Sequence, residues 1–116
     1  MNLMQIAFVF FAAVAAGGVL MAAMIAAKRR IPAILGPGHG LGGCCALSLL
    51  VIALLRSPSA GGRAWLACGV LAAGLIGGVL FFAVLFRKRA PLPLVLEHGS
   101  LGAIGIFLLY RIAFPA

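Results

Sequence analysis

Two histidines are the residues best suited to chemistry in this otherwise apolar chain. His39 and His98 each lie nine residues after the last arginine of a basic triplet and seven residues after a proline. With a helical rise of 1.5 Å per residue, each imidazole is expected about 10 Å along its helix from that proline. Ionisable side chains inside a membrane span are rare and usually face the bundle interior. We therefore predict that both imidazoles point at one central site, at the same depth.

Glycines surround both histidines in the predicted helices. Residues three, four or seven positions apart share a helical face. This spacing groups Gly36 and Gly43 with His39, and Gly102 and Gly105 with His98. The other two predicted helices carry glycine pairs at nearly the same depth: Gly17-Gly18 and Gly77-Gly78. Because glycine allows a backbone or a flat ligand to approach closely, we expect space around the imidazoles.

Two imidazoles at one depth fit the ligation of one b-type haem, because haem iron takes axial histidines readily. Guanidinium pairs well with carboxylate, so arginines at the membrane border are expected to bind the haem propionates. The predicted iron ligands are His39 and His98, and the predicted lining residues are Gly36, Gly43, Gly102, Arg30 and Arg89. Ligation of another pigment or metal remains open, as do histidines that bond across helices or handle protons.

Four apolar stretches must position these residues: Leu3–Ala27, Ile31–Leu55, Ala64–Phe86 and Ala90–Tyr110. The 116-residue chain is 66% hydrophobic with 9% charged residues and a mean hydropathy of +1.29, whereas a soluble domain has about a quarter charged residues. Crossing a bilayer takes about 20 helical residues, and each stretch is long enough. Only helices or closed barrels satisfy their backbone in lipid, and uninterrupted apolar runs are helices. We predict an all-α integral membrane protein with residues 1–116 in one domain.

Short connections between these stretches predict an up-down-up-down four-helix bundle. The net charge is +8, and all nine basic residues lie at the ends of apolar runs. They mark membrane borders rather than a nucleic-acid site. The two basic triplets share one side, so the positive-inside rule places them in the cytoplasm. Both termini are then expected on the outer, periplasmic side of a bacterial inner membrane.

The sequence also repeats itself in order. Gly17-Gly18-Val19-Leu20 recurs as Gly77-Gly78-Val79-Leu80, and the triplet with its proline recurs at residues 87–91, followed by the second histidine. We therefore predict two tandem helical-hairpin repeats, about 3–55 and 64–110. Parallel repeats of this kind pair about an approximate twofold axis along the membrane normal.

With one histidine on each of two separate helices, the chain resembles small membrane b-type cytochromes, in which four-helix bundles hold haem between histidines. The resemblance is architectural, covers most of the chain and rests on two histidines, whereas those cytochromes often carry four histidines and two haems. It implies an electron-transfer subunit, at most the redox subunit of an oxidoreductase. Such a subunit passes electrons between quinol or a redox partner and a larger complex. With almost no mass outside the membrane, the chain is expected to work within a larger membrane complex or as a homo-oligomer.

Two other functions remain open. A non-redox structural or assembly subunit would use the glycines for helix packing, and a small proton-coupled transporter would use Glu97 and the histidines as a relay. Glu97 is the sole acid, and its side chain is expected to diverge by about 100° from that of His98, which argues against a shared site. The adjacent Cys44 and Cys45 resemble the vicinal cysteines of small mercury-transport proteins. Those proteins use further cysteine pairs, whereas Cys68 has no neighbouring cysteine. No nucleophile–base pair, phosphate-binding loop or paired carboxylates support a hydrolase or transferase.

Overall fold

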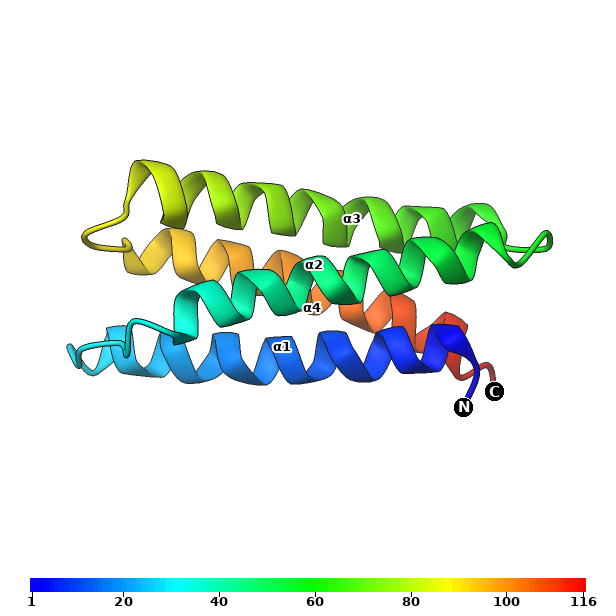
Figure 1. The fold of residues 1–116 in the computed structure, drawn as a ribbon, viewed down its shortest axis with the longest axis horizontal. Helices are drawn as coiled ribbons and strands as arrows, with labels where there is room; N and C mark the ends of the chain where they lie inside the picture. The colour runs from blue at the N-terminus through cyan, green and yellow to red at the C-terminus, as the bar shows by residue number, and fades with distance from the viewer.

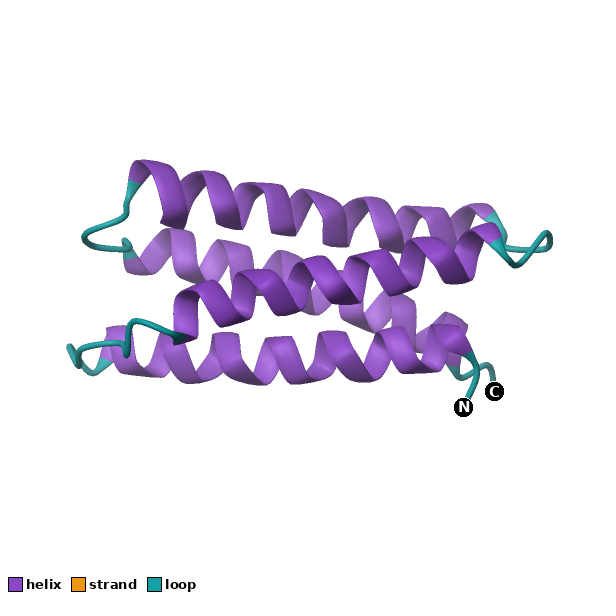
Figure 2. Ribbon diagram, in the orientation of Figure 1, coloured by secondary structure: helices purple, strands orange, loops and turns teal.

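The computed structural model describes all 116 residues and is entirely helical (Figures 1 and 2). Its elements are α1 (Leu3–Ala26), α2 (Leu35–Leu55), α3 (Gly62–Gly78), η1 (Val79–Leu85) and α4 (Leu92–Ala113). The π-helical η1 continues α3, so the chain forms four helices, each long and apolar enough to cross a membrane. This confirms the predicted all-α fold with four helices and no strands.

The helices lie along the longest axis of a molecule measuring 45 × 23 × 21 Å. Figure 1 shows both termini at one end and both basic turns at the other. α2 starts beside α1 and ends beside α3, whereas α4 starts beside α3 and ends beside α1. The Gln5 side chain donates a hydrogen bond to the carbonyl of Ala113 at 3.2 Å, which ties the start of α1 to the end of α4.

The packed core lies only in the terminal half of the bundle. Leu50 of α2 and Leu109 of α4 are its largest fully buried side chains. Around them pack mostly small residues and a few larger ones: Ala7, Phe11, Ala46, Leu54, Ala64, Ala67, Cys68 and Leu71. No residue in the ranges 12–42 and 75–104 is buried. The half of the bundle that contains both histidines is therefore packed loosely.

Prolines set the start of α2. The apolar run begins at Ile31, but the helix begins at Leu35, four residues later than the run suggested. A proline has no N–H and its ring clashes with the carbonyl four residues earlier, so helix interiors reject it. Starting at Leu35 places Pro37 in the first turn, where no backbone hydrogen bond is lost. α4 follows the same rule, because Pro93 is its second residue.

The end of the third helix widens into the π-helix η1, whereas α1 remains a regular α-helix over its whole length. Short π-helical segments are rare and often lie at functional sites. In this chain η1 carries Phe81 and Phe82, and the ring of Phe82 lies 5.5 Å from that of His98.

Truncation of a core leucine tests the position of the core. Leu50→Ala is expected to lower the free energy of unfolding by about 2–3 kcal/mol, the low end for such changes because lipid is as apolar as leucine. The measurement is denaturation by SDS in mixed micelles, followed through the fluorescence of Trp65, the single tryptophan. Leu41→Ala, at a residue 68% exposed on the same helix, is the control. Equal losses from the two substitutions would contradict the assigned core.

Candidate functional site

The structure brings the two histidines together. The ring centroids of His39 on α2 and His98 on α4 are 6.1 Å apart, and the ring planes make an angle of 70°. Both side chains are half-buried, and they come from different hairpins. No group of three or more histidine, cysteine, aspartate or glutamate side chains is positioned to hold a metal ion. Any metal chemistry at this position therefore depends on these two imidazoles.

The ring of His39 is held by the backbone of the preceding helix. Nδ1 of His39 lies 2.9 Å from the carbonyl oxygen of Val14 on α1. Because a carbonyl only accepts, Nδ1 carries the proton in this bond and Nε2 of the neutral ring keeps its lone pair. The ring of His98 lies near the backbone of Gly74 on α3, but it makes no hydrogen bond of this kind. The orientation of His39 is the one found in metal-ligating histidines, whose second ring nitrogen donates to a carbonyl or carboxylate.

Glycine makes this approach possible in both hairpins. A Cβ atom added to Gly18 would lie 2.9 Å from Cε1 of His39, and one added to Gly78 would lie 2.7 Å from Cε1 of His98. Both distances are too short for real carbon atoms, so an alanine would displace the ring. The neighbouring Gly17 has nothing within 4 Å of the added atom. Gly18 and Gly78 are therefore the glycines in contact with the imidazoles.

The other residues predicted for the site lie in different surroundings. Gly36 is exposed and Gly102 half-buried, and a Cβ at either would meet open space. Gly43 is buried, and its added Cβ would lie 3.3 Å from Cδ1 of Leu75, so it lets α2 and α3 approach. Arg30 and Arg89 are exposed in the basic turns. Their part in holding a cofactor stays a prediction.

A groove of about 140 Å³ runs between the third and fourth helices beside His98; we call it the α3–α4 groove. Its lining residues are Ala73, Gly74, Gly77, Phe81, Leu94, Glu97, His98 and Leu101. Glu97 and His98 thus share one site, which the sequence argument did not expect. Although their side chains diverge around α4, the groove is wide enough for both to border it.

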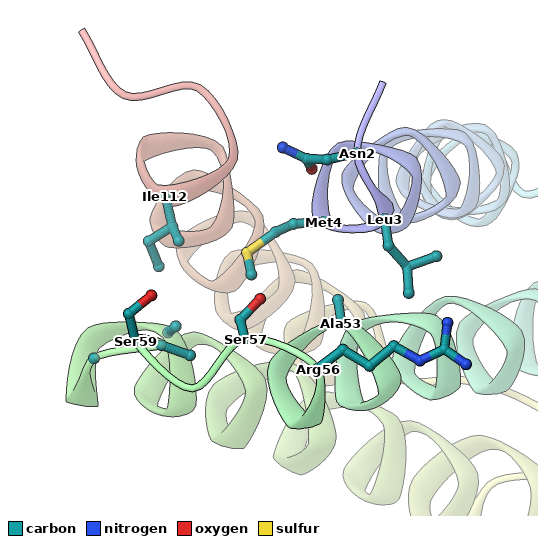
Figure 3. Close-up of a pocket in the computed structure, with 11 residues that line it drawn as sticks. Asn2, Leu3, Met4, Ala53, Arg56, Ser57, Ser59 and Ile112 are labelled. Atoms are coloured by element: carbon teal, nitrogen blue, oxygen red, sulfur yellow. The ribbon is translucent and has the colours of Figure 1, made fainter.

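A larger cavity, of about 430 Å³, opens at the other end of the bundle, near the termini (Figure 3). Arg56 is the only charged side chain in its lining, which Ser57 and Ser59 share with apolar residues. In Figure 3 the guanidinium of Arg56 extends beside Leu3, while the serine hydroxyls lie on the other side of the opening. The lining of this cavity contains no histidine, cysteine or carboxylate.

The sequence matches no known family model, no curated protein and no solved structure.

Substitution of the contacting glycines tests how the rings are held. Gly18→Ala is expected to push the His39 ring off the Val14 carbonyl, and Gly78→Ala to displace His98 in the same way. Nitrogen NMR of protein labelled with ¹⁵N-histidine should then show loss of the Nδ1-protonated, hydrogen-bonded signal of His39 in Gly18→Ala and a changed ring signal of His98 in Gly78→Ala. Gly17→Ala is the matched control, since an added Cβ there touches nothing. Ring signals that stay unchanged in Gly18→Ala would contradict this geometry.

Proposed function

We propose that the chain is a multi-pass protein of the bacterial inner membrane, built as an up-down-up-down bundle of two hairpin repeats. The order of glycines, basic triplets and histidines in the sequence supports the repeat. The matching contacts of Gly18 with His39 and of Gly78 with His98 support it further. The basic turns, with six cationic side chains, lie on the cytoplasmic side, and both termini lie outside.

Within that membrane, the chain acts as an electron-transfer subunit that binds one haem b between His39 and His98. The observation that carries this proposal is the 6.1 Å separation of the two imidazole rings, of which His39 is held by the carbonyl of Val14. Bonds from imidazole nitrogen to a transition metal are about 2 Å long, so two rings that ligate one ion from opposite sides have centroids roughly 6 Å apart. The pair is therefore at a separation suited to a shared ion.

The nitrogen chemistry of the site also suits a haem, and the space for one depends on movement of the helices. A ligating imidazole must be neutral, and the bond to Val14 holds His39 with Nε2 free to bind. The macrocycle is larger than the 140 Å³ groove, because sites for ligands of that size measure about 300–1,000 Å³. Binding thus requires the histidine half of the bundle to open. That half has no buried large hydrophobic side chain, so little packing opposes the opening.

Bound haem would supply a one-electron redox centre, and the chain's own residues would set its position and surroundings. His39 and His98 would hold the iron through ring nitrogens, and the bond to the Val14 carbonyl would make the His39 ring a stronger donor. Arg30 and Arg89 at the border pair with the propionates. Electrons then pass between quinol or a redox partner and a larger complex, or between copies of the chain.

One observation favours a second function, a small proton-coupled transporter. Glu97 and His98 line the same groove, and adjoining carboxylate and imidazole groups inside a membrane commonly form proton relays. This function predicts pH-dependent flux in liposomes that Glu97→Gln abolishes, in a protein without a cofactor.

An absorption spectrum of the purified protein, oxidised and then reduced, decides between these functions. A haem held by two histidines gives a Soret band that sharpens on reduction, and His39→Ala and His98→Ala are each expected to remove it. Gly17→Ala, which changes no contact of the rings, is expected to keep the band. A colourless protein, or a band that survives loss of both histidines, would refute the haem.

A further inference from the structure

The two hairpins differ where the second one forms the α3–α4 groove. Gly18 corresponds to Gly78, 60 residues later, so Val14 of α1 corresponds to Gly74 of α3. In the first hairpin a Cβ added to Gly42 would lie 2.9 Å from Cγ2 of Val14, so the valine fills that seam. In the second hairpin a Cβ at Gly74 would have Leu101 at 4.0 Å as its nearest neighbour. Leu101 stands where the first hairpin has Gly42, and beside it the α3–α4 groove remains open.

The second difference is the acid. His39 corresponds to His98, 59 residues later, so Gly38 corresponds to Glu97. Glu97 lies about 8 Å along α4 from its start, and none of the chain's side-chain hydrogen bonds includes it. A carboxyl group in a membrane span is costly unless it has a partner or a functional use. The structure thus shows no hydrogen-bonding partner for Glu97 within the chain.

The shape and lining of the groove define what it would hold. Its volume of about 140 Å³ is close to that of an engineered protein cavity, about 150 Å³, that binds benzene. Phe81, Leu94 and Leu101 supply apolar walls, whereas Glu97 and His98 supply the polar groups. Ala73 and Glu97 are exposed, so the groove opens on the outer face of a bundle that faces lipid. Its volume and lining fit one ring with a polar substituent, from a molecule that is dissolved in the bilayer and keeps its tail outside the groove.

We propose that the α3–α4 groove binds a quinol, with a ring hydroxyl donating a hydrogen bond to the Glu97 carboxylate. The proposal deepens the proposed electron-transfer function by naming the class of donor, and it rests on that function for the choice of a redox-active ring. A lipid acyl chain is the competing occupant. An acyl chain has no group for Glu97 to bind, so the carboxylate distinguishes the two.

The first hairpin supplies the test substitution. Gly74→Val gives α3 the side chain that α1 has at Val14, whose carbonyl accepts from His39. Leu101 stands where the first hairpin has Gly42, so the added methyl groups are expected to enter the groove beside Leu101. Glu97→Gln keeps the shape of the side chain and removes its charge. Gly69→Val, on the same helix with nothing near its added Cβ, is the matched control.

The experiment is photolabelling of the full chain in detergent with an azido-substituted short-chain ubiquinone, reduced to the quinol before irradiation. Labelled peptides, mapped by mass spectrometry, are expected in α3–η1 and the first half of α4. Gly74→Val should reduce labelling about tenfold or more, and Glu97→Gln by about tenfold through the lost charged hydrogen bond. Gly69→Val should label like the unaltered protein.

Each outcome decides something, because the absorption spectrum is recorded on the same samples. No labelling of the unaltered protein, or equal labelling in Gly74→Val, overturns the groove proposal and leaves any haem in place. Labelling that requires Glu97 in a colourless protein keeps the groove and overturns the haem. Labelling that excess phospholipid displaces and that Glu97→Gln leaves unchanged identifies an acyl-chain site and overturns the proposal. If Gly74→Val fails to fold, Glu97→Gln decides alone.

Discussion

How closely two helices approach in a lipid environment depends on the size of the side chains between them. Lipid is as apolar as leucine, so no hydrophobic force draws such helices together and van der Waals packing must do so. In the terminal half, buried alanines line the contacts, and Leu71 packs on Gly105, where an added Cβ would lie 2.7 Å away. The histidine half has no such core. One half of the bundle therefore holds the helices together, and the other half is left free to accommodate a ligand.

The same constraint explains how two polar rings fit between apolar helices. An imidazole buried without a partner is costly, and the partner of His39 is a backbone carbonyl that already accepts a helical hydrogen bond. The N–H of Gly18 bonds to the carbonyl of Val14 in the regular pattern of α1. The ring of His39 reaches that carbonyl by lying over Gly18, where no side chain stands in its way. Gly18 thus makes the hydrogen bond to Val14 possible, and this bond leaves Nε2 of His39 as the free ring nitrogen.

Much of the fold is predictable from the sequence, because apolar runs of about 20 residues leave few other structures. The exact start of α2 was not evident from the sequence. The hydropathy of residues 31–34 suggests a start at Ile31, whereas Pro37 requires the helix to begin later, at Leu35. Hydropathy also gives no sign of η1, because a π-helix has the same composition as an α-helix. The paired depth of His39 and His98 was readable from spacing. The partner of His39 on α1 was not, because a backbone carbonyl leaves no mark in the sequence.

The shared groove of Glu97 and His98 was missed for a different reason. Divergence around a helix separates two side chains only when the site is narrow, and this groove extends across both positions. Comparison of the hairpins does carry a signal, since Val14, Ala22 and Gly38 correspond to Gly74, Phe82 and Glu97. All three changes lie around His98, whose ring packs on Phe82 at 5.5 Å. Both imidazoles therefore lie against a glycine of the preceding helix, and they differ in what else surrounds them. A molecule that enters from the lipid through the α3–α4 groove meets His98 and not His39. Because of this difference, a site built from two similar hairpins would receive a ligand from one side only.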